Sequence, residues 1–208
     1  LEHKQLAHPL LIDLFRLSSE ETHQYDYALQ YRGQIIRSNV EAKQHAQLNP
    51  LGDDFGYQHL WNVSQGAGQN SSLVTWLQGQ RFYTWLSASS ADDTLHYLRT
   101  GANDPSSNLR SETSLLLRRE ASNSLFASVL ETHGYFNETT ETSLGARGKL
   151  HTVNVVGYSD EATVIEIAGD ELVLTVMINN KPDASETSQS EVDFDGKSYR
   201  WTGCFAIK

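Results

Sequence analysis

Short runs of alternating apolar and polar residues recur along almost the whole chain and constrain its fold more than any other feature. They are rich in β-branched and aromatic side chains, which favour strands over helices. Eleven runs have the length of a β-strand: residues 10–17, 25–36, 73–77, 82–87, 94–99, 114–119, 125–130, 153–158, 162–167, 171–178 and 191–201. The pattern therefore predicts a protein built mainly of strands.

Turn signals separate these runs at the intervals expected of hairpins. The firmest is Asp195-Gly196, which lies between the strand-like residues 192–194 and 199–201. Helical periodicity is scarce, and for residues 39–48 a short helix before Asn49-Pro50 and a loop are equally compatible with the sequence. We predict an all-β fold, an antiparallel β-sandwich formed as one domain by residues 1–208, with under a tenth of the chain in helix.

Charge and composition exclude several classes of function. The 208 residues carry a formal net charge of −10 at pH 7 without a Lys/Arg cluster, so no nucleic-acid partner is expected. The same balance argues weakly against a polyanionic substrate, because the few cations would have to be concentrated locally. No apolar run approaches the roughly 20 residues that a spanning helix needs, so no membrane span is predicted.

Generic catalytic and metal-binding signatures are missing from the sequence. There is no Gly-x-Ser-x-Gly, phosphate loop, dinucleotide fingerprint or His-Glu-x-x-His. The eight histidines are scattered without metal-ligand spacing, and the single cysteine, Cys204, excludes a multi-thiolate site. We expect neither a metal site nor a cofactor within this chain.

Residues 57–61 combine aromatics, an amide and an imidazole in Tyr-Gln-His-Leu-Trp, after the flexible residues 51–56. Such a mixture suits sugar binding, because C–H faces of a sugar stack on rings while its hydroxyls need fixed donors and acceptors. His59 and Trp61 are therefore candidate substrate-binding residues. An aromatic anchor that pins a long loop to the sheet is an equally good interpretation.

Residues 101–110 form the loop richest in polar side chains, and Asn103, Asn108 and Arg110 are its candidate binding residues. Arg110 can pair bidentately with a uronate carboxylate. The structural alternative, which we favour, is a loop brace in which Arg110 pairs with Asp104 or Glu112. The asparagines of such a loop also satisfy backbone groups in turns.

Glu131 and His133 follow the apolar run 125–130 and share one face of the expected strand. A carboxylate beside an imidazole raises the pKa of the imidazole and favours its cation, which suits a substrate carboxylate or hydroxyl. A structural Glu-His pair that closes a hairpin explains the pattern equally well. Both interpretations stay open at this point.

Several segments, in order, resemble the oligoalginate lyases of polysaccharide lyase family seventeen, within the heparinase II/III-like group. They cover almost the whole chain, from near residue 11 to residue 203. The matching segments are residues 11–18, 23–26, 33–34, 51–52, 56–61, 75–77, 81–84, 101–110, 131–136, 195–197 and 201–203. The sequence departs from the family pattern at Ser107 and Thr132, where Phe and Pro are frequent, which concerns loop rigidity and not the polar positions.

The resemblance implies that this chain is the carboxy-terminal β-sandwich of a larger lyase. In that family a helical toroid precedes the sandwich and the elimination site lies between the two. The paired Asn-His, the tyrosines and the His/Asp zinc ligands would all precede Leu1, so no catalytic residue and no metal are expected here. The resemblance also implies alginate oligosaccharides and the missing helical domain as partners, a homodimer as an option, and a bacterial periplasmic, cell-surface or secreted location.

The leading hypothesis is thus an exo-acting oligoalginate lyase in which this domain completes one wall of the site and is inactive alone. A uronate lyase neutralises the substrate carboxylate, removes the C5 proton and protonates the C4 leaving oxygen. Those groups would lie upstream, leaving Glu131, His133, Asn103, Asn108 and Arg110 as candidates for the cleft rim. A freestanding carbohydrate-binding module with residues 57–61 as its platform, and a purely structural sandwich, are the rival hypotheses.

Overall fold

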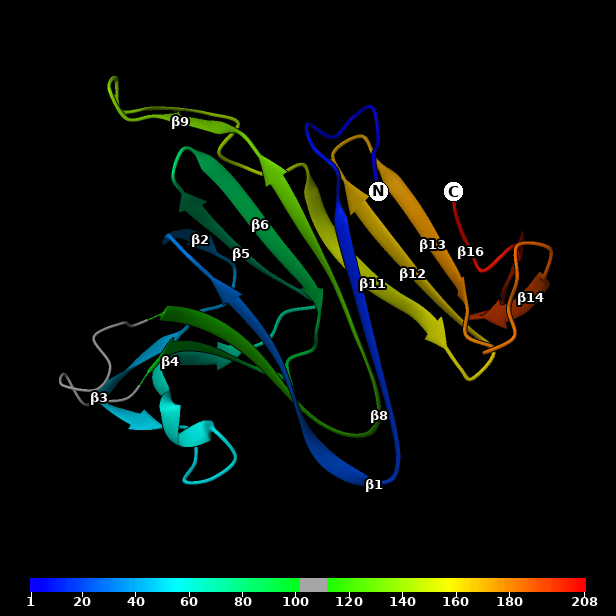
Figure 1. The fold of residues 1–208 in the computed structure, drawn as a ribbon, viewed down its shortest axis with the longest axis horizontal. Coiled ribbons are helices and arrows are strands. Elements are labelled where there is room, and N and C mark those ends of the chain that lie inside the picture. Colours follow the sequence, from blue (N-terminus) through cyan, green and yellow to red (C-terminus); the bar gives the residue numbers. More distant parts are fainter. Residues whose placement is uncertain (102–111) are drawn as a thin grey trace.

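The computed structural model describes residues 1–101 and 112–208, and almost all of its regular structure is β-strand (Figure 1). The strands are β1 (Leu11–Tyr31), β2 (Gln34–Ser38), β3 (Lys43–Pro50), β4 (Leu60–Ala67), β5 (Ser71–Gln78), β6 (Arg81–Ala88), β7 (Thr94–Thr100), β8 (Glu112–His133), β9 (Tyr135–Asn137), β10 (Thr142–Leu144), β11 (Leu150–Tyr158), β12 (Ala162–Gly169), β13 (Val173–Asn179), β14 (Gln189–Phe194), β15 (Lys197–Thr202) and β16 (Phe205–Ile207). The single 3-10 turn η1 (Tyr57–His59) is the only helical element of the described residues. The predicted all-β sandwich is confirmed.

Two unusually long strands organise the first sheet. β1 and β8 have 21 and 22 residues and pair antiparallel from Leu11↔Leu130 to Tyr31↔Thr113, with one register shift between Ser18 and His23. Along its other edge β8 pairs first with β7 and then with β6, giving the order β2-β5-β6-β8-β7-β4-β3. β8 bends where it changes partner, and the sheet folds over on itself (Figure 1).

This curled sheet has two halves that face each other. The first half contains β2, β5 and β6, the second contains β3, β4 and β7, and β1 and β8 run through both. Between them lies an inner core with members from both halves: Val40, Val74, Trp76, Trp85, Leu95, Leu115, Leu117 and Phe126. Tyr27 stacks on Phe126 with ring centroids 5.3 Å apart, and the Ser38 and Tyr97 hydroxyls lie 2.6 Å apart across the gap. Burial of the apolar side chains between the halves explains why the sheet curls.

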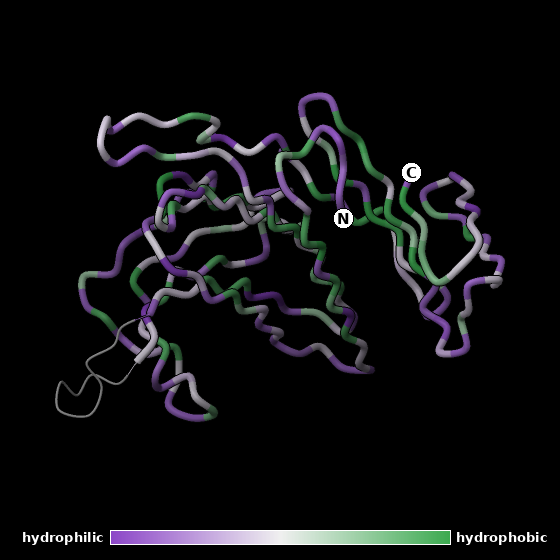
Figure 2. Tube along the Cα trace, turned by 45° about the horizontal axis from the view of Figure 1, so that its top comes forward, coloured by the Kyte–Doolittle hydropathy of each residue, from purple (hydrophilic) through white to green (hydrophobic). Residues whose placement is uncertain are grey.

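A second sheet, β11-β12-β13-β16, packs against the outer face of the first half (Figure 1). Its inward side chains join those of β5, β6 and β8 in a second core that includes Leu73, Leu86, Leu125, Val129, Leu150, Val153, Ile165, Ile167, Leu174 and Val176. Apolar residues follow these packed strands in Figure 2, while the connecting loops are hydrophilic. The two packed layers are the sandwich that the alternating runs predict.

The hairpin β14-β15 covers the outer face of the second sheet. Tyr199 and Trp201 of the hairpin pack with Ala162, Val164 and Met177 in a third core. Asp195 and Gly196 have φ values of 51° and 75°, the left-handed geometry of a tight two-residue hairpin turn. The Asp195-Gly196 prediction is therefore confirmed.

The structure corrects the prediction for residues 39–48. No helix forms in this segment, and only residues 39–42 lie outside regular structure, because residues 43–50 form β3, which pairs with β4 at the edge of the curled sheet. All but one of its side chains are exposed, so no buried face imposes an alternating apolar pattern. Polar edge strands of this kind also resist pairing with other molecules. No helix among the described residues has the length and apolar character to cross a membrane.

Candidate functional site

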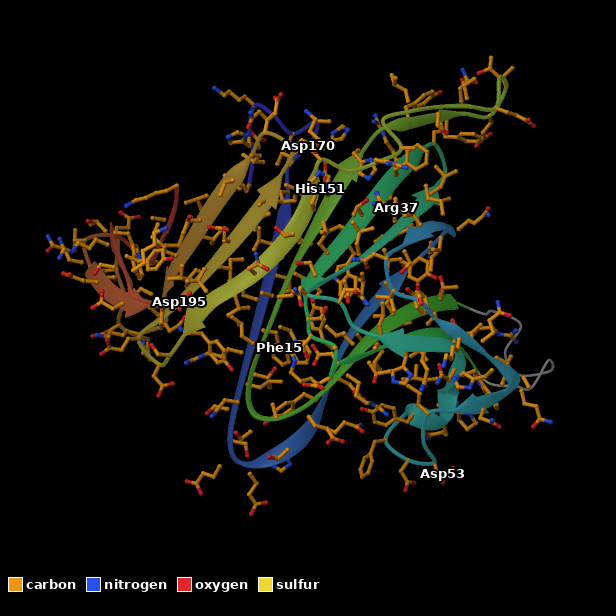
Figure 3. The ribbon with its side chains drawn as sticks, turned by 180° about the vertical axis from the view of Figure 1, so that it is seen from behind. Phe15, Arg37, Asp53, His151, Asp170 and Asp195 are labelled. Carbon is orange, nitrogen blue, oxygen red and sulfur yellow. The ribbon has the colours of Figure 1, made fainter. Side chains whose placement is uncertain are left out.

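His59 and Trp61 lie where β4 begins, at one end of the second half of the curled sheet. His59 is exposed at the end of η1, whereas Trp61 is half-buried. The Trp61 indole Nε1 donates to the Gly101 carbonyl at 2.7 Å, and the Gly101 N–H donates to the His59 carbonyl at 3.1 Å. The structure thus brings the 51–59 loop, marked by Asp53 in Figure 3, to the point where β7 ends.

The other three candidates of this part of the sequence lie within the ten residues after Gly101. Asn103, Asn108 and Arg110 lie outside the described residues. Their predicted roles therefore stay predictions.

Tyr57 joins this loop to an ion pair on the outer face of the second half. Asp26 of β1 accepts two hydrogen bonds from Arg118 of β8, each 2.8 Å, and the Tyr57 hydroxyl donates to the same carboxylate at 2.5 Å. The guanidinium carbon lies 5.9 Å from the Tyr57 ring centroid. Burial and the Asp26 carboxylate raise the pKa of Tyr57, and the bond to Asp26 raises the pKa of Arg118. Both shifts keep Arg118 cationic and the Tyr57 phenol neutral at physiological pH.

His96 of β7 lies on the same face, one strand further along. It is 5% exposed, and neither ring nitrogen has a hydrogen-bond partner within residues 1–101 and 112–208. Burial, helped by the nearby Arg118 cation, lowers the pKa of His96 to about 4. The imidazole is therefore neutral near pH 7 and offers one donor and one acceptor.

An amide of β4, opposite Leu98 of β7, is also incompletely bonded. Asn62 of β4 donates to the Gln65 side chain at 2.8 Å, but its buried Oδ1 has no partner in the described part of the chain. Buried polar groups are normally hydrogen-bonded, so unbonded ones need an explanation such as water or a ligand. We call Asp26, Tyr57, His96 and Arg118 the outer-face cluster.

Glu131 lies at the other end of β8 and is 3% exposed. Its carboxylate accepts hydrogen bonds from the backbone N–H groups of Lys149 at 2.9 Å and Leu150 at 3.1 Å. A Cβ added to Gly148 would come within 2.5 Å of this carboxylate, so the backbone can approach only because residue 148 is glycine. Glu131 therefore fixes the start of β11 against β8.

His133 shares the face of Glu131, as the strand pattern predicts, and is 4% exposed. Its Nδ1 lies 2.8 Å from the Gly145 carbonyl, which can only accept, so this nitrogen carries a proton. Its Nε2 lies 2.8 Å from the Thr84 hydroxyl of β6. Of the two interpretations left open, this geometry favours the structural one. Substrate binding by the pair stays a prediction.

Sequence reasoning missed Arg118 and His96. The available signal was Arg118-Arg119, two cations that follow three leucines in a strand-like run. Such a pair needs buried anionic partners on both faces, and the structure supplies Asp26 for Arg118 and Asp93 for Arg119. Asp26 lies 92 positions before Arg118, which no local pattern reveals.

No family model matches the chain. It is 36% identical over 212 aligned residues to an alginate lyase of Stenotrophomonas maltophilia (strain K279a), an alignment that covers 99% of the chain. This chain is a domain related to alginate lyases. An exo-oligoalginate lyase of Saccharophagus degradans is 29% identical over 209 residues, or 97% of the chain. This alginate-lyase-related domain spans 28% of the length of each of the two relatives.

The described residues of the alginate-lyase-related domain contain no group of three or more His, Cys, Asp or Glu side chains placed to hold a metal ion. The zinc that the family resemblance implies would need ligands from elsewhere. What the described residues offer is hydrogen bonding and fixed charge. These suit the binding and orientation of a substrate.

Proposed function

We propose that this chain is the carboxy-terminal β-sandwich of an exo-type oligoalginate lyase and lines one wall of a site where uronate glycosidic bonds break by β-elimination. The observation that carries the proposal is similarity over 99% of the chain to a protein named alginate lyase that is several times longer. A chain that matches only part of such a protein can form one wall of the site. Under this proposal the chain alone is inactive.

The chemistry divides naturally between two parts of such an enzyme. β-Elimination needs neutralisation of the uronate carboxylate, a base at C5 and an acid at the C4 oxygen. We assign these groups, with any zinc, to a helical domain and further residues outside this chain. The partners of the domain under this proposal are that helical domain, alginate oligosaccharides and, as an option, a second copy. Its location is the periplasm, the cell surface or the medium.

The surface that we assign to substrate surrounds His59, Trp61 and the outer-face cluster. His59 is exposed and its side chain makes no hydrogen bond to the described residues. His96 and Asn62 lie buried beneath the adjoining face, and the His96 ring nitrogens and the Asn62 Oδ1 atom have no hydrogen-bond partner in the described part of the chain. Asn103, Asn108 and Arg110 follow Gly101 in sequence and belong to the same proposed wall.

The test uses the complete enzyme and measures turnover and stability together. His59→Ala should lower kcat/KM on oligoalginates roughly tenfold to a hundredfold, because one hydrogen bond to a charged group is worth about 1.5–3 kcal/mol. The melting temperature should stay within a few degrees, since the imidazole is exposed. Val63→Ala is the matched control on β4, because Val63 is also exposed and offers only methyl groups. Equal kcat/KM for wild type and His59→Ala would remove His59 from the wall.

A further inference from the structure

A second hollow surface lies away from the outer-face cluster, where β8 bends past β11. Two adjoining hollows of about 490 and 450 Å³ share Asn123 of β8 and Tyr158 of β11 as lining residues. The first extends toward Asn70 and Asn154, and the second toward Arg16. Each volume falls within the roughly 300–1,000 Å³ of small-molecule sites. Together they form one groove, which we call the bend groove.

The groove is lined by amides whose hydrogen-bonding capacity is largely unused. The side chains of Asn70 and Asn154 are exposed and make no hydrogen bond to any described residue. Asn123 accepts one hydrogen bond from the Ser18 hydroxyl at 2.8 Å, which leaves its NH₂ group available. Three amides therefore converge on one hollow, each able to bond hydroxyl groups as donor, acceptor or both.

Tyr158 supplies an aromatic surface at the junction of the two hollows. Its ring packs against the second core, between the curled sheet and the second sheet, which holds it in place. Its hydroxyl has no partner among the described residues. A fixed ring beside free amides is the combination that sugars need, because C–H faces stack on the ring while hydroxyls bond to the amides.

The two arginines of the groove differ in availability. All five N–H groups of Arg119 are used, by Asp93, the Ser124 hydroxyl and the carbonyls of Ala88 and Leu125. Arg119 therefore forms part of the lining of the bend groove and has no N–H group left for a ligand.

Arg16 in contrast bonds only through Nη1, to the Ser159 carbonyl at 2.7 Å and to Asp160 at 2.9 Å. The Asp160 side chain is 97% exposed, and exposed pairs contribute little stability. A carboxylate of a ligand can therefore replace Asp160 at small cost, and the planar guanidinium fits it bidentately.

We propose that the bend groove is a second, non-catalytic oligosaccharide-binding site, which takes a uronate-containing chain with one carboxylate at Arg16 and a sugar ring on Tyr158. This site is separate from the wall assigned above. Arg118 and Arg119 are consecutive in β8 and point to opposite faces, the first to the outer-face cluster and the second to the groove. The choice of uronate as ligand agrees with the proposed function, but the amides and the ring would bind neutral sugars too.

The experiment is calorimetric titration of the 208-residue chain with a mannuronate tetrasaccharide and with cellotetraose, a neutral chain of comparable length. We expect the uronate to bind more tightly than cellotetraose. Asn154→Ala should weaken both ligands about two- to tenfold, because it removes neutral hydrogen bonds. Arg16→Gln should weaken only the uronate. Gln80→Ala is the matched control, because Gln80 is an exposed amide in the β5–β6 turn, far from the groove.

Tyr158→Ala should abolish detectable binding, and its melting curve establishes whether the variant is folded. If it does not fold, Asn154→Ala decides the question, since the Asn154 side chain is exposed and makes no hydrogen bond to any described residue. No binding by the wild type, or unchanged affinity in Asn154→Ala, would overturn the proposal. Equal weakening of both sugars by Arg16→Gln would overturn the carboxylate assignment. Turnover by the complete enzyme tests the wall, whereas the loss of binding in Asn154→Ala tests the groove, so the failure of one proposal does not imply failure of the other.

Discussion

At the scale of single residues, two buried aspartates are paired with arginines from other segments of the chain. Arg118 bonds Asp26 on one face of β8, and Arg119 bonds Asp93 on the other. The Asp26 side chain is 8% exposed and the Asp93 side chain 2% exposed. A buried ion pair contributes little net stability compared with apolar residues, yet removal of one partner leaves a charge without compensation. These pairs therefore fix the arrangement of β1, β7 and β8.

Arg118→Ala should destabilise the domain strongly. It leaves the Asp26 carboxylate buried with Tyr57 as its main remaining partner, and we expect a loss of about 2–4 kcal/mol in the free energy of unfolding, the lower part of this range reflecting partial exposure. Urea denaturation measures it. Arg200→Ala is the control, because its pair with Glu191 is exposed on both sides, and it should leave the midpoint unchanged. Equal midpoints for Arg118→Ala and wild type would contradict the argument.

His96 makes the stability of the domain depend on pH in a defined window. Its folded pKa of about 4 lies below the ordinary value of 6.5, so between these values the unfolded chain binds a proton that the folded chain does not. Stability that is present above pH 6.5 is therefore lost as the pH falls toward 4. His96→Gln should flatten this part of the melting-temperature profile relative to wild type. Parallel profiles for the two proteins would show that His96 does not titrate as described.

At the scale of elements, the polar side chains near the end of β8 fasten the second sheet to the first. Glu131 receives two backbone N–H groups from the segment that starts β11. His133 holds the Gly145 carbonyl of the same connection. The strand alternation correctly places the two residues on one face. It says nothing of what covers that face, because the covering segment follows after the β9-β10 hairpin.

Glu131→Ala should therefore lower the melting temperature of this chain, while activity per folded molecule in the complete enzyme is preserved. Two backbone donors lose a charged acceptor, and each such bond is worth about 1.5–3 kcal/mol. Thermal denaturation followed by circular dichroism measures the effect, with Glu138→Ala as control because Glu138 is exposed. A stable Glu131→Ala domain with impaired oligouronate turnover in the complete enzyme would instead favour the substrate-binding interpretation.

Strand existence could be predicted from the sequence more reliably than strand length. The runs 10–17 and 25–36 suggest two strands, but β1 continues through the polar residues between them to Tyr31. Apolar alternation reports burial, and it fades where the strand passes from one half of the sheet to the other, although backbone pairing goes on. The run 25–36, predicted as one strand, is interrupted at Gly33, between the end of β1 and the start of β2. There a Cβ would lie 2.0 Å from the Leu77 carbonyl oxygen, and φ is +106°.

At the scale of the whole molecule, the domain consists of layers, each covering an apolar face of the one before. The two halves of the curled sheet enclose the inner core, the second sheet covers the first half, and the β14-β15 hairpin covers the second sheet (Figure 1). The hairpin is small and its turn was predictable, but its docking depends on a close approach that no sequence pattern shows. Gly157 of β11 lies directly under the Phe194 ring.

Gly157→Ala tests how the hairpin docks. The added Cβ would come within 2.4 Å of two carbon atoms of the Phe194 ring and 3.0 Å of its Cβ, so the hairpin must shift. We expect a lower melting temperature and a change in the fluorescence of Trp201, a hairpin residue that is 6% exposed and packs against the second sheet. Phe194→Ala alone should also destabilise, because it removes apolar packing. The double variant should lose less stability than the sum of the two single losses, because the added Cβ no longer clashes once the Phe194 ring is removed. Strictly additive losses would mean that the Gly157–Phe194 contact does not limit the approach of the hairpin.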